Sequence, residues 1–399
     1  MATAALDVLR EVCKPALLPD AALERVDLTG ADPVLPSSFA IGAAAQASLA
    51  AAALAASEVG RLRNGLVQRV SVDMVDAAVE ARAAFLVDGN APNVWDPIAG
   101  LYPCADGWVR VHTNFAHHRD GVLRLLGLPE GPESSRDAVP SALSRWPAIE
   151  FETAAAADGL AVAALRNPGQ WEAHPQSAAV ATLPLVEISR LDVDAGPLDW
   201  KDLPRTARPL EGLRVLEATR ILAGPVAGRT LAAYGADVML VNAPHLPNID
   251  ALADTSRGKR SALADLRSSD DRERFVRALS GSHVFLHSYR RGAFEGLGFG
   301  ADEIARLRPG IVHASLSAYG RLGPWATRRG FDSLVQTASG FNVDEAAAAG
   351  VVEPKPLPVQ MLDMASGFLL AFGVEAALLR QRAEGGSWQV QVSLARTGQ

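Results

Sequence analysis

The sequence predicts an α/β protein, with an open, mostly parallel, Rossmann-like sheet in the C-terminal half and a smaller α+β domain before it. Short apolar segments typical of buried strands occur at residues 213–218, 238–241, 284–287 and 311–316. Segments of helical periodicity separate them, as residues 226–234 do after the first strand. Because a helical crossover brings the next strand back in the same direction, this alternation predicts a parallel sheet.

The composition indicates a soluble globular protein with one large or two medium cores. The chain has 399 residues, of which 49% are hydrophobic and 21% charged, and its net charge is −7. Acidic and basic residues are interspersed without a basic tract, so we expect no nucleic-acid partner. Cys13 and Cys104 form no CxxC motif, which indicates a reducing compartment and no structural zinc.

No segment predicts export or membrane insertion. The N-terminus lacks a basic stretch followed by an apolar one, so we expect a cytoplasmic protein. The Ala-rich residues 40–56 are interrupted by Gln46 and Ser48, and alanine is only weakly apolar. This run therefore predicts a buried, tightly packed helix and no contact with a membrane.

Changes in pattern divide the chain into four parts. They are residues 1–90, with helix and strand segments; residues 91–190, a small α+β domain; residues 191–209, a linker with three prolines; and residues 210–399, the sheet domain. Within the small domain, residues 108–112 predict a strand and residues 120–128 a helix.

An internal repeat becomes visible when the chain is compared with itself. Residues 41–73 and 361–393 align at a constant offset of 320, and both predict an apolar helix, a polar turn and an alternating strand. The first copy has Ala43 where the second has Asp363. Both segments are short and Ala-rich, so chance similarity between two buried helices is the alternative explanation.

A series of short motifs runs through the C-terminal half. They are residues 210–217, 222–229, 234–238, 257–261, 308–312, 317–320 with 323–324, 329–332 with 336–340, and 362–363 with 366–367. In this order and spacing they resemble the family III CoA-transferases, the formyl-CoA and carnitine-CoA transferase type. The resemblance implies a CoA-binding domain at residues 210–399.

The N-terminal half is similar to the later part of such a transferase. Residues 68–72, 101–103, 106–109 and 173–176 carry this likeness. Residues 1–90 thus resemble the end of the family's large domain. The family's order is rearranged, with the small domain first and the CoA domain second.

The resemblance implies that Asp363 is the catalytic carboxylate. In the family, an aspartate attacks the thioester carbonyl of acyl-CoA, and an aspartyl-CoA thioester follows from the resulting anhydride. A carboxylate suits this role because its anhydride and thioester are both labile. Read without the resemblance, Asp363 is the N-cap of a helix over residues 364–379. Both roles are compatible, since a helix N-terminus stabilises an anion.

The residues that the resemblance assigns to CoA follow predicted strands or lie in basic segments. They are Arg220, Ile221, Leu222 and Ala223 after the first strand, Ser288 and Tyr289 after a later one, and Arg267 and Arg329. Such positions agree with ligand binding at the carboxyl ends of parallel strands. Arg267 belongs to a basic cluster with Arg257, Lys259 and Arg260, which either binds phosphates or is a solvated face. Tyr289 either stacks on adenine or packs at the rim.

Some positions depart from the family pattern. Leu240 and Asn242 replace the family's usual lysine and glutamate and are followed by Ala243, and Gly296 stands where an arginine is frequent, which puts CoA affinity in doubt. A degenerate, non-catalytic acyl-CoA-binding protein or partner subunit is therefore the alternative function. An acyl-CoA racemase is the third, and Phe331 disfavours it because related racemases have a histidine base there.

Three histidines of the small domain are the candidates for a metal site. His112, His117 and His118 lack a third ligand at fixed spacing, so surface or packing roles are favoured over a metal site. We expect acyl-CoA and a small or medium carboxylic acid as substrates, with no permanently bound cofactor. The resemblance also implies a homodimer.

Overall fold

The centre of the molecule is a seven-stranded sheet in the order β6-β12-β11-β10-β7-β8-β9. The computed structural model describes residues 4–16, 18–200, 203, 208–246 and 248–399. The strands are β6 (Glu187–Leu191), β7 (Arg214–Ala218), β8 (Asp237–Asn242), β9 (Arg260–Leu263), β10 (Val284–His287), β11 (Val312–Ser317) and β12 (Ser387–Ser393). Neighbouring strands pair in parallel except for β6, which is antiparallel to β12. The prediction of a mostly parallel sheet is confirmed.

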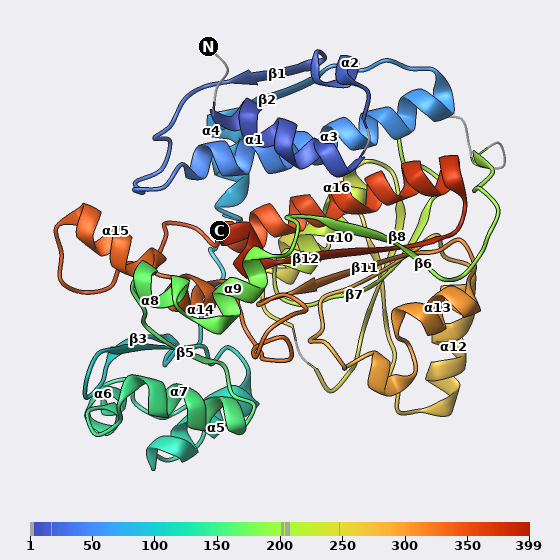
Figure 1. Ribbon diagram of the computed structural model, residues 1–399. Helices are drawn as coiled ribbons and strands as arrows, with labels where there is room; N and C mark the ends of the chain where they lie inside the picture. The colour runs from blue at the N-terminus through green and yellow to red at the C-terminus, as the bar shows by residue number, and fades with distance from the viewer. Residues whose placement is uncertain (1–3, 17, 201–202, 204–207, 247) are drawn as a thin grey trace.

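Helices cover both faces of this sheet (Figure 1). α10 (Ala223–Ala233) and α16 (Met361–Glu384) pack on one face, and α12 (Ser269–Ser280) and α13 (Ala301–Leu307) pack on the other. Strands covered on both faces are buried along their length, as β10 is throughout. Short elements complete this half: α11 (Leu252–Thr255), η3 (Glu295–Leu297), α14 (Asp332–Ala338), α15 (Phe341–Ala349) and α17 (Leu394–Gly398).

The predicted internal repeat is present in the structure. α3 (Ile41–Asn64) and α16 both have 24 residues, and both their ends are offset by 320. β2 (Val70–Asp73) and α4 (Met74–Ala81) follow α3 as β12 and α17 follow α16. β1 (Val26–Thr29) pairs in parallel with β2, as β11 does with β12.

α3 and α16 pack against each other and join the two copies (Figure 1). Helix α1 (Ala4–Cys13) packs on α3, while η1 (Lys14–Ala16) and α2 (Asp20–Leu23) connect it to β1. By length and composition α16 could span a membrane, yet it is buried inside the protein along almost all of that stretch. The Ala-rich run is likewise part of a buried helix, α3.

The small domain has its own sheet and core. β3 (Gly100–Pro103), β4 (Trp108–Val111) and β5 (Val162–Ala164) form an antiparallel sheet. It packs with α5 (Ala116–Leu126), α6 (Ala138–Leu143) and α7 (Ala148–Ala157). α8 (Pro168–Glu172) and α9 (Pro175–Ala181) then lead to β6 in the large sheet. Of the predicted linker, residues 201–202 and 204–207 lie outside the described residues.

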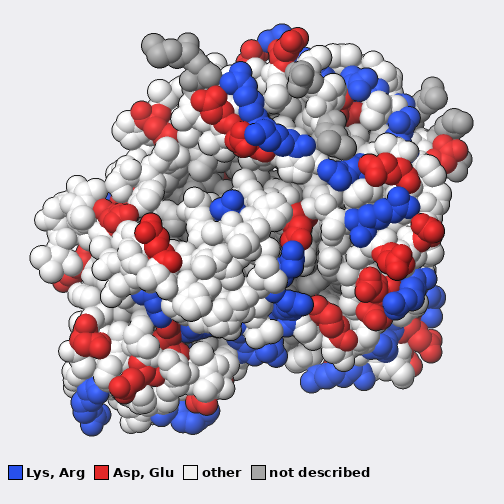
Figure 2. All heavy atoms as spheres, in the orientation of Figure 1, with Lys and Arg blue, Asp and Glu red and all other residues white. Residues whose placement is uncertain are grey.

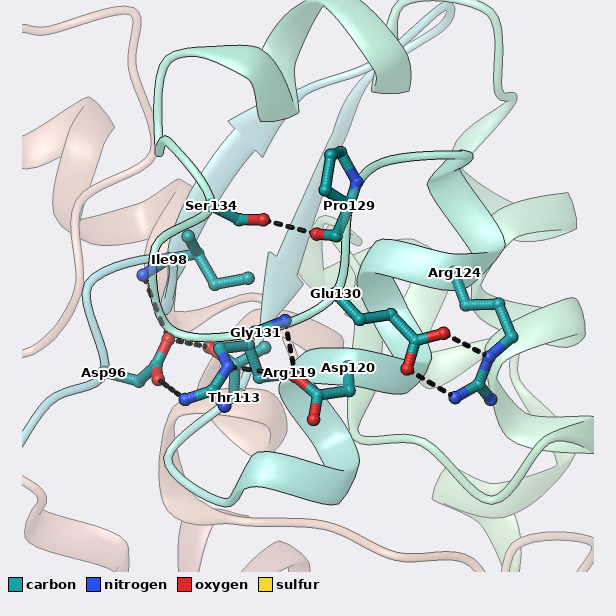
Figure 3. Close-up of polar contacts among 10 residues, drawn as sticks. All are labelled: Asp96, Ile98, Thr113, Arg119, Asp120, Arg124, Pro129, Glu130, Gly131 and Ser134. Atoms are coloured by element: carbon teal, nitrogen blue, oxygen red, sulfur yellow. Dashed lines mark hydrogen bonds and ion pairs between the residues drawn. The ribbon is translucent and has the colours of Figure 1, made fainter.

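A polar network fixes the start of α5 (Figure 3). Arg119 donates to Asp96, 3.3 Å away, and to Asp120, 3.1 Å away. The Asp96 carboxylate also accepts from the Ile98 amide and the Thr113 hydroxyl, and Asp120 accepts from the Gly131 amide. Because Arg119 and Asp120 lie in α5 and their partners Asp96 and Gly131 lie before and after it, the network holds the start of the helix in one orientation.

Charge is distributed differently inside and outside the molecule. On the face in Figure 2, acidic and basic side chains alternate around a mostly uncharged centre. Inside, Lys259 donates to Glu217 at 2.8 Å, and both side chains are buried. Burial raises the pKa of Glu217, and Lys259 and Thr219 partly offset that rise. The pair joins β7 to the loop before β9.

We expect Lys259→Met to lower the free energy of unfolding by about 3–5 kcal/mol, because Glu217 would stay buried without its cation. Arg260→Met is the matched control, since Arg260 pairs with Asp237 at the surface and such pairs contribute about 1 kcal/mol or less. Urea unfolding measures both variants. An equal decrease in the free energy of unfolding for both variants would contradict the larger contribution expected from the buried pair.

Candidate active site

A cavity of about 270 Å³ lies at the carboxyl ends of β7, β10 and β11. The large domain contributes the loop between β7 and α10, the residues after β10 and β11, and the segment before α14. The small domain contributes Phe115, His117 and His118 from the start of α5. Both domains therefore build the cavity. It lies at the carboxyl ends of the strands, where open α/β proteins bind ligands.

Most of the predicted site residues meet in this cavity. The residues lining it include Asp363, Arg220, Ile221, Leu222, Ala223, Ser288, Tyr289 and Arg329. Arg220 lies over the Phe115 ring, with its guanidinium carbon 4.4 Å from the ring centre, and so connects the two domains. The Arg220 amide donates to the Ser288 hydroxyl at 3.3 Å, which connects the loops after β7 and β10.

The loop after β7 has unusual backbone geometry. Ile221 has a φ of 75°, a left-handed conformation that costs a β-branched residue on the order of 1–3 kcal/mol. A Cβ on Gly224 would lie 2.8 Å from the side chains of Ser288 and Thr219. Glycine is thus needed there for α10 to begin so close to β10. Strain at a ligand-facing loop is a common feature of functional sites.

The predicted basic cluster does not gather at the cavity. Arg267 binds Asp265 through several hydrogen bonds and contacts His245 at the surface. Arg257, Lys259 and Arg260 each pair with a different carboxylate, from Asp254, Glu217 and Asp237 respectively. None of these four residues lines the cavity, so its cations come from elsewhere.

Asp363 lies inside a helix, which corrects the expectation that it is an N-cap. α16 begins at Met361, and its N-cap residue, Gln360, makes no side-chain cap hydrogen bond. The capping carboxylate is Asp332 at the start of α14, which accepts from the Asp363 amide at 2.8 Å. The Asp363 side chain is therefore released from capping and lines the cavity.

The first repeat retains this capping arrangement without the nucleophile. The Asp32 carboxylate accepts from the Gly42 amide at 3.0 Å and from the Ala43 amide at 2.9 Å. Asp32 thus does for α3 what Asp332 does for α16. Since Ala43 takes the place of Asp363, only the second copy presents a carboxylate.

Burial and a neighbouring carboxylate control the charge of Asp363. Its pKa is raised well above the usual value, first by burial and then by Asp332. Burial likewise raises the pKa of Asp332 to about 6, although the amides of Asp363 and Leu362 and the Gln336 side chain favour its ionised form. The two carboxyl groups therefore compete for ionisation near neutral pH.

Arginines outnumber carboxylates among the charged residues of the cavity wall. Arg220, Arg290, Arg291, Arg328 and Arg329 line it, and Asp363 is the one carboxylate among its described lining residues. Burial and then Arg290 lower the pKa of Arg329. The pKa of His118 falls to about 3 through burial and the nearby His117, Arg329 and Arg220. Such crowding of positive groups favours an anionic ligand.

Comparison with known proteins agrees with this geometry. The model of CoA-transferase family III matches twice, over residues 25–206 and 210–398. The chain belongs to CoA-transferase family III. The two matches meet between β6 and β7, so the rearranged order seen in the sequence reflects two successive family segments.

Curated relatives of this family III chain are about twice as long as the part matched. A probable fatty acyl-CoA transferase of Mycobacterium tuberculosis is 36% identical over 202 residues, which cover 47% of this chain and 51% of the relative. The succinate–glutarate CoA-transferase of Agrobacterium fabrum is 30% identical over 212 residues, covering 48% and 52%. The chain spans about half the length of these relatives.

Matches to other relatives extend over both halves of the chain. A probable CoA-transferase of M. tuberculosis is 27% identical over 453 aligned positions, covering 94% of this chain and 57% of the relative. Among solved structures, a hypothetical protein of M. tuberculosis has 34% identity and a TM-score of 0.44, with 48% of this chain and 56% of that chain covered.

The sequence did not single out several residues of the cavity or of its carboxylate pair. Asp332, Arg290, Arg291 and Arg328 were not assigned, and His117 and His118 were expected at the surface or in packing. His118 is buried and His117 exposed, yet both line the cavity, while His112 stacks on Phe331 with ring centres 3.8 Å apart. The available signal was that Phe331 and Asp332 belong to the family motif at residues 329–332.

We expect Asp332→Asn to lower the pKa of Asp363, because the neighbouring negative charge that raises it would be lost. The carboxyl carbon shift of Asp363, followed against pH by NMR, measures this. Asp32→Asn is the matched control, because it removes the same helix contact in the first repeat. Each variant should lose about 1 kcal/mol of stability. Equal titration of Asp363 in both variants would refute the coupling.

Proposed function

We propose that this chain transfers CoA between carboxylic acids, with Asp363 as the nucleophile. The observation that carries the proposal is the isolation of one carboxylate among five arginines in a cavity at the sheet's carboxyl edge. The named relatives support the reaction class, since they include a succinate–glutarate and a formyl-CoA:oxalate CoA-transferase. Small-acid thioesters are thus the first substrates to test.

The proposed reaction proceeds in four balanced steps. The Asp363 carboxylate attacks the acyl-CoA carbonyl, which releases CoA thiolate and leaves a mixed anhydride. The thiolate then attacks the aspartyl carbonyl, releasing the first acid and forming an aspartyl-CoA thioester. The second acid attacks this thioester to give a new anhydride, and the thiolate takes the new acyl group. Asp363 returns as a carboxylate, so the cycle needs no external redox partner.

The raised pKa of Asp363 has a chemical consequence for this scheme. Only the ionised form attacks, so burial and Asp332 limit the reactive fraction at neutral pH. A more basic carboxylate is also a stronger nucleophile once it is ionised. The cavity therefore favours reaction as the pH rises and suppresses it under acid conditions.

The cations of the cavity are the proposed contacts for the CoA phosphates. Leu240, Asn242 and Gly296 lack charge at positions where the family usually has it, which favoured the degenerate alternative. Arg290 and Arg329 lie in the cavity and interact with each other electrostatically, so they offer charge from another direction. We propose that they replace the missing groups together with Arg220. Phe331 occupies the wall where a racemase would need a base.

The resemblance also supports two finer expectations, a cytoplasmic location and a homodimer. Both rest on the family likeness alone. The substrates proposed here, acyl-CoA and free carboxylic acids, are soluble metabolites, which fits such a location.

The first test traps the intermediate. Incubation with succinyl-CoA and hydroxylamine should convert Asp363 to a hydroxamate, which peptide mass spectrometry locates. Asp363→Asn should stay unmodified, and acyl transfer should fall at least about 1,000-fold because the nucleophile is lost. Binding of CoA without modification, across formyl-, acetyl- and succinyl-CoA, would favour the degenerate alternative.

The second test concerns the phosphates. Arg290→Met and Arg329→Met should each raise the Kd of CoA about tenfold, since each would lose a charge-assisted contact. Isothermal titration at two salt concentrations measures the affinity and its salt dependence. Arg267→Met should bind CoA normally, because its guanidinium is held by Asp265 outside the cavity. Weaker binding by this variant instead would place the phosphates over β9.

A further inference from the structure

A second cavity, of about 280 Å³, lies beside the one that contains Asp363. Strands β6, β12, β11 and β10 form its floor, and η3 and the start of α13 form part of its wall. The two cavities share Tyr289, Arg291, Leu316 and Ser317. The transfer reaction proposed above uses no other residue of this second cavity, so that reaction does not account for it.

The floor of the second cavity is a strip of polar side chains. β11 and β12 contribute polar residues at every second position, and their register pairs His313 with Gln389, Ser315 with Gln391 and Ser317 with Ser393. The residues between them, such as Ala314 and Val390, belong to the apolar core on the other face of the sheet. Parallel strands covered by helices are ordinarily apolar on both faces, so folding alone does not explain the strip.

Two histidines of this floor have buried ring nitrogens without a partner. His287 and His313 are 5% and 4% exposed, and their ring centres lie 5.2 Å apart. Within the part of the chain that the structure describes, Nδ1 of His287 and both ring nitrogens of His313 make no hydrogen bond. Because buried polar groups are normally paired, the floor is incomplete without a further hydrogen-bonding molecule.

Burial also keeps both rings uncharged. It lowers the pKa of His287 well below its usual value, with His313 adding to the effect, and it lowers the pKa of His313 to about 4. A neutral imidazole offers one donor and one acceptor, and the hydroxyl of Ser315 and the amides of Gln389 and Gln391 likewise offer both. The floor therefore matches groups that both donate and accept hydrogen bonds, of which the hydroxyl group is the simplest.

The charged residues around this cavity balance one another. They are two arginines, Arg291 and Arg321, and two glutamates, Glu187 and Glu295. Arg321 donates to both carboxylate oxygens of Glu187 at 2.8 Å, an ion pair that joins the loop after β11 to β6. The cavity with Asp363 has an excess of arginines, whereas the described residues around the second cavity have no excess of either sign. A ligand without net charge fits it best.

We propose that the second cavity binds an uncharged polyhydroxyl compound of about monosaccharide size. Its hydroxyl groups would pair with Gln389, Gln391, Ser315 and the two histidine rings. The cavity is slightly smaller than the range of about 300–1,000 Å³ that is usual for drug-sized ligands, which favours a compact molecule. Because Tyr289 and Arg291 line both cavities, the compound would touch the wall of the transfer site without taking part in the transfer.

NMR of the histidine rings in the full chain, without acyl-CoA, tests this proposal. Titration with myo-inositol, D-glucose or D-mannitol should shift the ring signals of His287 and His313 until they saturate for at least one compound, with a Kd in the millimolar range or tighter. Gln391→Leu and Ser315→Ala should each raise that Kd about tenfold, because each removes a hydrogen-bonding group from the floor. Gln68→Leu is the matched control, since that glutamine is exposed in the other half of the chain.

Because no acyl-CoA is present, the outcome does not depend on whether the chain transfers CoA. The absence of a saturable shift with all of these compounds, up to about 100 mM, would show that the cavity holds water alone and would overturn the proposal. Equally tight or tighter binding of glucose 6-phosphate at the same rings would overturn it in favour of an anion site. The same Kd for Gln391→Leu, Ser315→Ala and Gln68→Leu would place the compound elsewhere on the molecule. Circular dichroism of each purified variant establishes that the variants are folded.

Discussion

The site depends on how closely α16 approaches its neighbours. A Cβ at Gly367 would lie 2.7 Å from the Ala223 carbonyl and 2.8 Å from the Val226 side chain, so only glycine allows α10 and α16 to touch there. Gly373 has the same role against Val390 and Val186. This contact sets the height of Asp363 above the loop after β7. It therefore determines whether a ligand held by that loop can reach the carboxylate.

The electrostatics of the cavity follow from the same packing. Burying the first turn of α16 places Asp363 and Asp332 together away from water, which disfavours ionisation of both. The small domain then adds His117 and His118 opposite Arg220 and Arg329. An anion entering the cavity would relieve the repulsion between Arg290 and Arg329. Ligand binding and the charge state of the site are thus coupled through the contact between the two domains.

The pattern of apolar residues in the sequence was sufficient to predict the strands and helices of the central sheet. The strand predicted at residues 284–287 coincides with β10, because a short apolar run bounded by polar residues is typical of a buried strand. α16 begins three residues before the predicted helix, because the group that caps it lies 31 residues earlier in the chain. Likewise, the distribution of Arg257, Lys259 and Arg260 over separate ion pairs depends on tertiary neighbours. The sequence next to a residue does not predict partners that lie far away in the chain.

The first repeat shows that capping of the helix start does not depend on the candidate nucleophile. Asp32 caps α3 as Asp332 caps α16, although position 43 is alanine where the second repeat has Asp363. A buried helix start needs an acceptor for its first amides, and Asp32 supplies one whether or not chemistry occurs nearby. The side chain at position 43 makes no contribution to that requirement. Foldability and reactivity therefore reside in different residues around the same helix start. A duplicated half can lose its reaction and still keep its architecture.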